Sequence, residues 1–117
     1  MSAHKHTPQD WLRDETTVYA LNLEGSNRFS ARVEGGWTTR GRTRTQVDEL
    51  VANARLISAA PDSLDANVMF VESMDRFCGI EPDWDDVRIY DELPSSELAR
   101  AYFAARAAIA KATGEPA

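Results

Sequence analysis

The chain has 117 residues, a length that provides for one domain with one hydrophobic core and argues against a two-domain enzyme. Apolar residues make up 43% of the chain, but many of them are alanine, so we expect an ordered core of modest size. Nineteen acidic residues against thirteen basic ones give a formal charge of −6, which argues against a dedicated DNA-reading protein, because phosphate neutralisation supplies most of that affinity.

The N-terminal segment is polar, contains Pro8 and has few large apolar side chains. We therefore expect residues 1–16 to be a flexible arm, which Trp11 holds against the folded body. Residues 17–117 are then expected to form a single domain.

Two alternating runs predict a β-hairpin. Residues 17–23 are rich in β-branched and aromatic side chains, residues 24–27 are typical of a turn, and residues 28–34 alternate strictly. Residues 37–39 follow a pair of glycines and are expected to add a short third strand. The side chains predicted to face the core are Tyr19, Leu21, Leu23, Phe29, Ala31 and Val33.

Helical spacing of apolar residues begins after the strands. A first helix is predicted over residues 46–60, and a kink or break is expected at Ala60-Pro61, because proline inside a helix loses a hydrogen bond. A second helix then extends to Cys78-Gly79, with its apolar positions at Leu64, Val68, Val71 and Met74.

The last third of the chain predicts one more helix, which begins at residues 94–97 and ends at Gly114. Between the second and third helices the acidic segment has no sustained period, and residues 87–90 are interpreted as a short strand. The sequence therefore predicts an α+β fold, in which about three helices cover one face of a small antiparallel sheet.

Part of the first helix resembles a known group of proteins. Residues 53–64 read N-A-R-L-I-S-A-A-P-D-S-L, similar to a run N-A-R-L-I-A-A-A-P-D-L-L in small proteins of tailed phages and prophages. In that group a T-P-G-P-W element precedes a few strands and this helix, and residues 7–11, T-P-Q-D-W, resemble it. The resemblance covers mainly residues 7–11 and 47–66, and it implies a phage origin but no particular reaction. Residues 75–93 have no counterpart, so we expect the specific function there.

The residues that common catalytic and metal sites require are missing or widely separated in the sequence. His4 and His6 lie in the predicted arm, remote from Cys78, so no nucleophile with an orienting base is indicated. The two histidines have no third ordered ligand, the acidic residues after position 80 lack the spacing of a calcium loop, and no phosphate-binding glycine loop is present. We therefore expect that the protein is not an enzyme and that it binds neither a cofactor nor a metal ion.

A single cysteine excludes an internal disulfide, and the chain has neither an apolar leader nor eighteen consecutive apolar residues. We therefore expect a protein of the cytoplasm, in this case that of an infected or lysogenic bacterial host, with no membrane partner.

Charge is segregated along the sequence, with a local +4 over residues 28–44 and a local −8 over residues 62–92. Solvated faces, or a sheet and helices of opposite charge that pack together, would give the same pattern. A functional interpretation is a binding surface, because carboxylates steer basic partners and an aromatic side chain supplies anchor area. The predicted partner-binding residues are Asp75, Glu81, Asp83, Trp84, Asp85, Asp86 and Tyr90. A secondary basic patch comprises Arg28, Arg32, Arg40, Arg42 and Arg44.

The acidic character and the resemblance together suggest a protein-binding inhibitor of a host defence nucleoprotein complex, similar to anti-CRISPR proteins, which occupies a basic groove. One alternative is a structural or accessory phage protein that forms a homo-oligomer through its alanine-rich last helix. Another is a nucleic-acid contact through the arginines of the hairpin, against which the overall negative charge argues.

Overall fold

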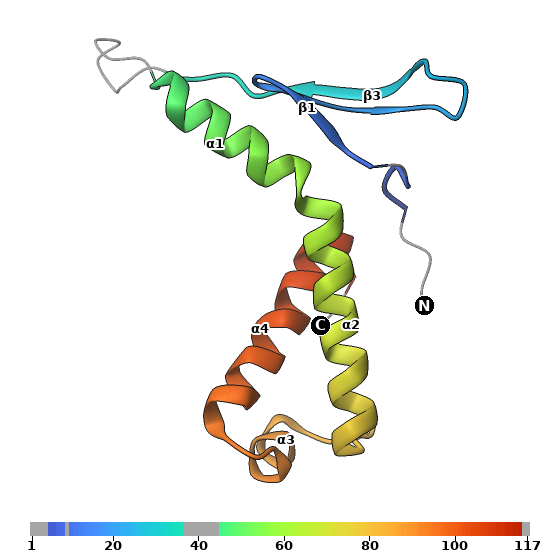
Figure 1. Ribbon diagram of the computed structural model, residues 1–117. Helices are drawn as coiled ribbons and strands as arrows, with labels where there is room; N and C mark the ends of the chain where they lie inside the picture. Colours follow the sequence, from blue (N-terminus) through green and yellow to red (C-terminus); the bar gives the residue numbers. More distant parts are fainter. Residues whose placement is uncertain (1–4, 9, 37–44, 116–117) are drawn as a thin grey trace. The chain divides into compact units, whose positions relative to one another are not determined.

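The computed structural model describes residues 5–8, 10–36 and 45–115 of the chain (Figure 1). The fold is α+β, as predicted, and consists of a three-stranded antiparallel sheet and four helices. In chain order the elements are β1 (Leu12–Asp14), β2 (Thr17–Leu21), β3 (Asn27–Arg32), α1 (Val47–Ser58), α2 (Ala60–Cys78), α3 (Asp86–Glu92) and α4 (Ser96–Thr113). The chain divides into two compact units, an N-terminal unit that ends at Pro61 and a C-terminal unit that begins at Asp62.

The sheet of the N-terminal unit has the strand order β1-β2-β3, with Leu12 opposite Tyr19 and Val18 opposite Ala31. The predicted hairpin is therefore confirmed as β2 and β3. The third strand of this sheet is β1, which comes from the segment expected to be a flexible arm. The strand expected over residues 37–39 lies outside the described residues.

The core-facing side of β2 was predicted wrongly. Val18 and Ala20 are fully buried, whereas Leu23 is 94% exposed and Tyr19 and Leu21 are half-buried. Val18 and Ala20 lie opposite Ala31 and Phe29 of β3. On that face of β3 the predicted core residue Phe29 is half-buried, whereas Ala31, which was also predicted to face the core, is exposed. A frame shifted by one residue moves every side chain of a strand to the other face.

Two further contacts complete the N-terminal unit. Helix α1 packs against β1 and β2 and buries Ala54 completely. The indole of Trp11 lies against the ring of Phe29, with 4.9 Å between the ring centroids, and its Nε1 donates a hydrogen bond to the carbonyl oxygen of Thr7 at 3.2 Å. Trp11 thus ties the residues before β1 to the sheet, as expected from the sequence.

The predicted break between the first two helices is confirmed. Helix α1 ends at Ser58, Ala59 is its C-cap, and α2 begins at Ala60 with Pro61 as its second residue. Proline is tolerated there because the first amide groups of a helix have no intrahelical acceptor.

The C-terminal unit consists of α2, α3 and α4. Helices α2 and α4 run in opposite directions, and α3 lies between their ends at the connection (Figure 1). Leu64 and Val68 of α2 are buried, and the central cluster comprises Ile89, Leu93, Ala99 and Tyr102. The prediction of a strand at residues 87–90 is wrong, because these residues belong to α3. Ile89 and Leu93 are four residues apart, the spacing of one helical face, and both point into the core.

Candidate functional site

The candidate site lies at the C-terminal end of α2. Gly79 has a positive φ of 64°, and the amide of Ile80 donates a hydrogen bond to the carbonyl oxygen of Asp75 at 3.0 Å. This six-to-one bond is the Schellman arrangement, which requires a left-handed residue and therefore favours glycine. It turns the chain so that Ile80 packs against the central cluster while Asp75 stays on the last turn of α2.

A tight turn over residues 81–84 follows. The amide of Trp84 donates to the carbonyl oxygen of Glu81 at 3.1 Å, and Pro82 occupies the second position, where its fixed φ suits a turn. Trp84 is consequently directed toward the cluster of Ile89 and Tyr102, and its side chain is half-buried.

Helix α3 follows Trp84 directly in the sequence, with Asp85 as its N-cap. The carboxylate of Asp85 accepts a hydrogen bond from the amide of Arg88 at 2.8 Å and so forms the N-cap of α3. The guanidinium of Arg88 lies over the indole of Trp84 at 4.1 Å from the ring centroid. The acidic segment, defined as residues 81–92, is therefore held by a turn, a cap and a cation–π contact.

A polar link joins α2 to α4 inside this unit. Tyr102 is 3% exposed, and its hydroxyl donates a hydrogen bond to the Asp75 carboxylate. Burial, followed by this hydrogen bond and the negative charge of Asp75, raises the pKa of Tyr102 to about 12, and Arg106 opposes the shift. Tyr102 is thus a neutral hydrogen-bond donor at physiological pH.

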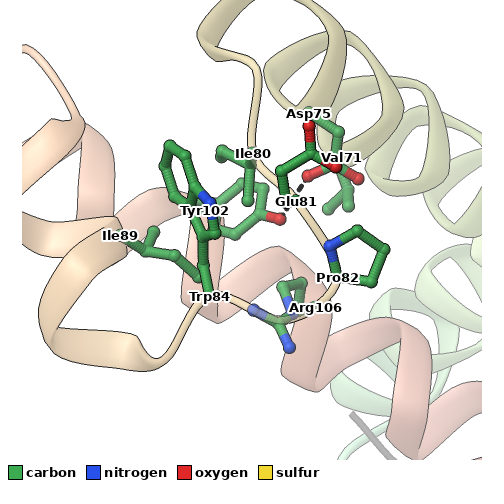
Figure 2. A pocket seen from close by; sticks show the side chains of 9 residues that line it. All are labelled: Val71, Asp75, Ile80, Glu81, Pro82, Trp84, Ile89, Tyr102 and Arg106. Atoms are coloured by element: carbon green, nitrogen blue, oxygen red, sulfur yellow. Dashed lines mark hydrogen bonds between the residues drawn. The ribbon is translucent and has the colours of Figure 1, made fainter.

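Residues of α2, of the turn that follows it, of α3 and of α4 line an open hollow of about 310 Å³, which we call the Trp84 hollow (Figure 2). Its apolar and aromatic lining comprises Val71, Ile80, Pro82, Trp84, Ile89 and Tyr102. Its charged lining comprises Asp75, Glu81 and Arg106. Figure 2 shows these side chains gathered around the turn that connects α2 to α3.

The structure brings together some of the predicted partner-binding residues and separates others. Asp75, Glu81 and Trp84 line the Trp84 hollow. Asp83, Asp85 and Asp86 are exposed but do not line it, and Asp85 is the cap of α3. Tyr90 is 42% exposed and stacks on Phe103, with 5.1 Å between the ring centroids.

The other lining residues were not among the predicted partner-binding residues; they are Val71, Ile80, Pro82, Ile89, Tyr102 and Arg106. Tyr102 and Arg106 were read only as part of a helix, although their spacing of four residues places them on one face of α4. The signal that was available is the pair of aromatic residues at 102–103 followed by an arginine one turn later.

The predicted basic patch is only partly described. Arg28 and Arg32 are exposed on β3, and Arg32 lines a separate hollow of about 250 Å³ in the N-terminal unit. Arg40, Arg42 and Arg44 lie outside the described residues.

The boundary between the two units is also a boundary of charge. Residues 62–117 contain twelve acidic and five basic side chains, so the C-terminal unit carries a formal charge of −7, while residues 1–61 carry +1. The negative charge of the protein therefore belongs to the unit that contains the Trp84 hollow.

No helix over residues 45–115 is long and apolar enough to cross a membrane. Within the described ranges, no three His, Cys, Asp or Glu side chains are placed to share a metal ion.

Comparison with known proteins identifies a family. A family model described as Salmonella phage P22 protein Y8K6 matches residues 1–116, nearly the entire chain. No curated protein and no solved structure matches the chain. The chain belongs to the Salmonella phage P22 protein Y8K6 family and is a small phage protein.

Proposed function

We propose that this phage protein is a non-catalytic inhibitor that binds a host protein or nucleoprotein complex and occupies a basic groove, in the manner of an anti-CRISPR or other anti-defence protein. The observation that carries the proposal is the acidic segment. Six exposed carboxylates lie within twelve residues, on a unit with a formal charge of −7. They are Glu81, Asp83, Asp85, Asp86, Asp91 and Glu92.

None of these six carboxylates forms an ion pair with another described residue. Arg88, the one basic residue of the segment, has its guanidinium over Trp84 instead. An unpaired acidic surface accelerates encounter with a basic groove and competes there with nucleic acid. A rigid scaffold of turn, cap and helix reduces the entropy that binding would otherwise cost.

A catalytic role is less consistent with the chain. The C-terminal unit contains no histidine, so Cys78 has no imidazole base within its own unit. The carboxylates that line the Trp84 hollow share it with Arg106 and belong to an open depression, which suits contact with a partner surface.

The test uses the full-length protein immobilised and exposed to host lysate. The expected result is capture of a nucleic-acid-binding complex, which added duplex DNA displaces in a concentration-dependent way. A variant with Asp83→Asn, Asp85→Asn and Asp86→Asn should associate about tenfold more slowly at low salt and lose most of its salt dependence.

The matched control carries Asp62→Asn, Asp65→Asn and Glu72→Gln, which changes the net charge equally at exposed positions of α2. It should bind nearly as the wild type does. If DNA fails to compete, or if both triple variants lose the same amount, the acidic segment is not the binding surface.

One observation favours a second candidate, a homo-oligomeric structural or accessory protein. Ala101, Ala104 and Ala108 of α4 are exposed, and small side chains allow helices to approach closely. Native mass spectrometry of the protein alone distinguishes the two candidates, since an inhibitor of a host complex needs no self-assembly.

A further inference from the structure

The Trp84 hollow has the composition of a receptor for one long side chain. Its volume of about 310 Å³ lies at the lower end of the ~300–1,000 Å³ that small-ligand pockets occupy, so it suits a side chain and not a folded element. Val71, Ile80 and Pro82 offer apolar surface to an aliphatic stem, and the aromatic rings of Trp84 and Tyr102 form part of the wall (Figure 2).

The two carboxylates of the hollow outnumber its one guanidinium, so their negative charge is only partly neutralised within the lining. Asp75 accepts the hydrogen bond from Tyr102, and a carboxylate has acceptor capacity for further donors. Glu81 is exposed and forms neither a hydrogen bond nor an ion pair through its side chain with any described residue. Both carboxylates can therefore accept hydrogen bonds from an incoming donor.

Arg106 does not satisfy this demand. Its guanidinium lies 5.5 Å from the ring centroid of Tyr102 and 5.6 Å from that of Phe103, and it forms no ion pair with Asp75 or Glu81. The lining therefore has a net charge of −1, in a unit that is itself strongly acidic. A cation is attracted to this hollow and an anion is repelled.

We infer that the Trp84 hollow receives an arginine side chain of the protein partner, with the guanidinium between the carboxylates of Asp75 and Glu81 and the stem along Val71 and Pro82. Arginine suits the site better than lysine because its planar fork donates to two acceptors at once and stacks on aromatic faces. The inference rests on the proposed function and specifies how Glu81 of the acidic segment, together with Asp75, would bind the partner.

The test requires no host protein. Acetyl-arginine-N-methylamide is titrated into the isotopically labelled full-length protein, and acetyl-citrulline-N-methylamide, which has a similar shape but no charge, serves as the matched probe. We expect amide shifts at Ile80, Glu81 and Trp84 with the arginine probe. The citrulline probe should bind at least about fivefold more weakly.

Two variants locate the contact. Glu81→Gln should weaken the arginine probe at least about fivefold, and Asp75→Asn should do so while keeping an acceptor for the Tyr102 hydroxyl. The control Asp62→Asn removes an exposed carboxylate elsewhere in the same unit and should change nothing. Equal binding of both probes, shifts that spread over all acidic residues, or unchanged binding by Glu81→Gln would each overturn the inference.

Failure of the proposed function gives a different result. If the hollow binds the arginine probe but no DNA-displaceable host complex is captured, the groove-occupying role is wrong and the arginine site stands. If a complex is captured through the acidic segment and Glu81→Gln captures it as well as the wild type, the arginine site is wrong and the function stands.

Discussion

The hydroxyl of Tyr102 on α4 donates a hydrogen bond to the carboxylate of Asp75 on α2, and so connects two helices through residues that are 27 positions apart. Tyr102 also belongs to the central cluster of the C-terminal unit, and both residues line the Trp84 hollow. The same contact therefore stabilises the unit and fixes one wall of the candidate site. A hydrogen bond to a charged group typically contributes about 1.5–3 kcal/mol.

Removal of this donor should be measurable. Tyr102→Phe keeps the ring in the core but leaves the half-buried Asp75 carboxylate without its partner, so we expect the free energy of unfolding to fall by about 1.5–3 kcal/mol. Urea denaturation of the full-length protein gives this value. Asp75→Asn, which keeps an acceptor, should cost less, and equal losses for the two variants would contradict this account.

The pH dependence follows from the pKa of Tyr102, which is raised to about 12, mainly by burial. In the folded protein the Tyr102 hydroxyl keeps its proton above pH 10, where the same hydroxyl loses its proton in the unfolded chain. This stabilisation, at most about 2–3 kcal/mol, is therefore complete below pH 10 and is lost as the pH rises toward 12.

Absorbance at 295 nm measures this titration directly. The chain has three tyrosines, and one of them should titrate later than the other two in the folded protein. Tyr102→Phe should remove the late step. A late step that persists in this variant would assign the raised pKa to another tyrosine.

The end of α2 depends on the conformation of Gly79. A Cβ added there meets no atom within 4 Å, but the φ of 64° is unfavourable for alanine. Gly79→Ala should cost about 1 kcal/mol or more through backbone strain alone. Gly36→Ala is the control, since that position also has open space and no positive φ, and its melting temperature should not fall. Similar destabilisation by both variants would contradict this reason.

The start of α3 depends on the carboxylate of Asp85. Asp85→Ala should lower the stability by about 1 kcal/mol and speed the hydrogen exchange of the Arg88 amide, which would lose its acceptor. Asp85→Asn should exchange nearly as slowly as the wild type, because its amide oxygen also caps a helix. This variant allows the triple asparagine substitution to test binding without loss of the helix.

Two substitutions test which side of β2 faces the core of the N-terminal unit. Val18 is fully buried, so Val18→Asp should cost about 3 kcal/mol or more and unfold the sheet, whereas Leu23→Asp at a 94% exposed position should change the stability by less than about 0.5 kcal/mol. Circular dichroism melting distinguishes the two. A stable Val18→Asp variant would contradict the burial of Val18 in the core.

Local chemistry explains what the sequence alone determined about this protein. The break before Pro61, the end of α2 at Gly79, the start of the last helix at Ser95 and the hairpin of β2 and β3 depend on neighbouring residues and were predicted. Ser95 caps α4 by accepting from the amide of Leu98 at 3.1 Å. Turn and cap preferences act over a few residues, so the sequence can be read for them without the fold.

The other features of the fold and the site depend on contacts between residues far apart in the sequence. The face of β2 depends on which side α1 covers, and the strand partner β1 comes from a segment too short and polar to be recognised. The helical state of residues 86–92 depends on the burial of Ile89 and Leu93 in a cluster with Tyr102. The Trp84 hollow exists because α4 brings Tyr102 and Arg106 next to a turn about twenty residues earlier. Long-range packing of this kind is set by complementary shape and burial, which no local pattern records.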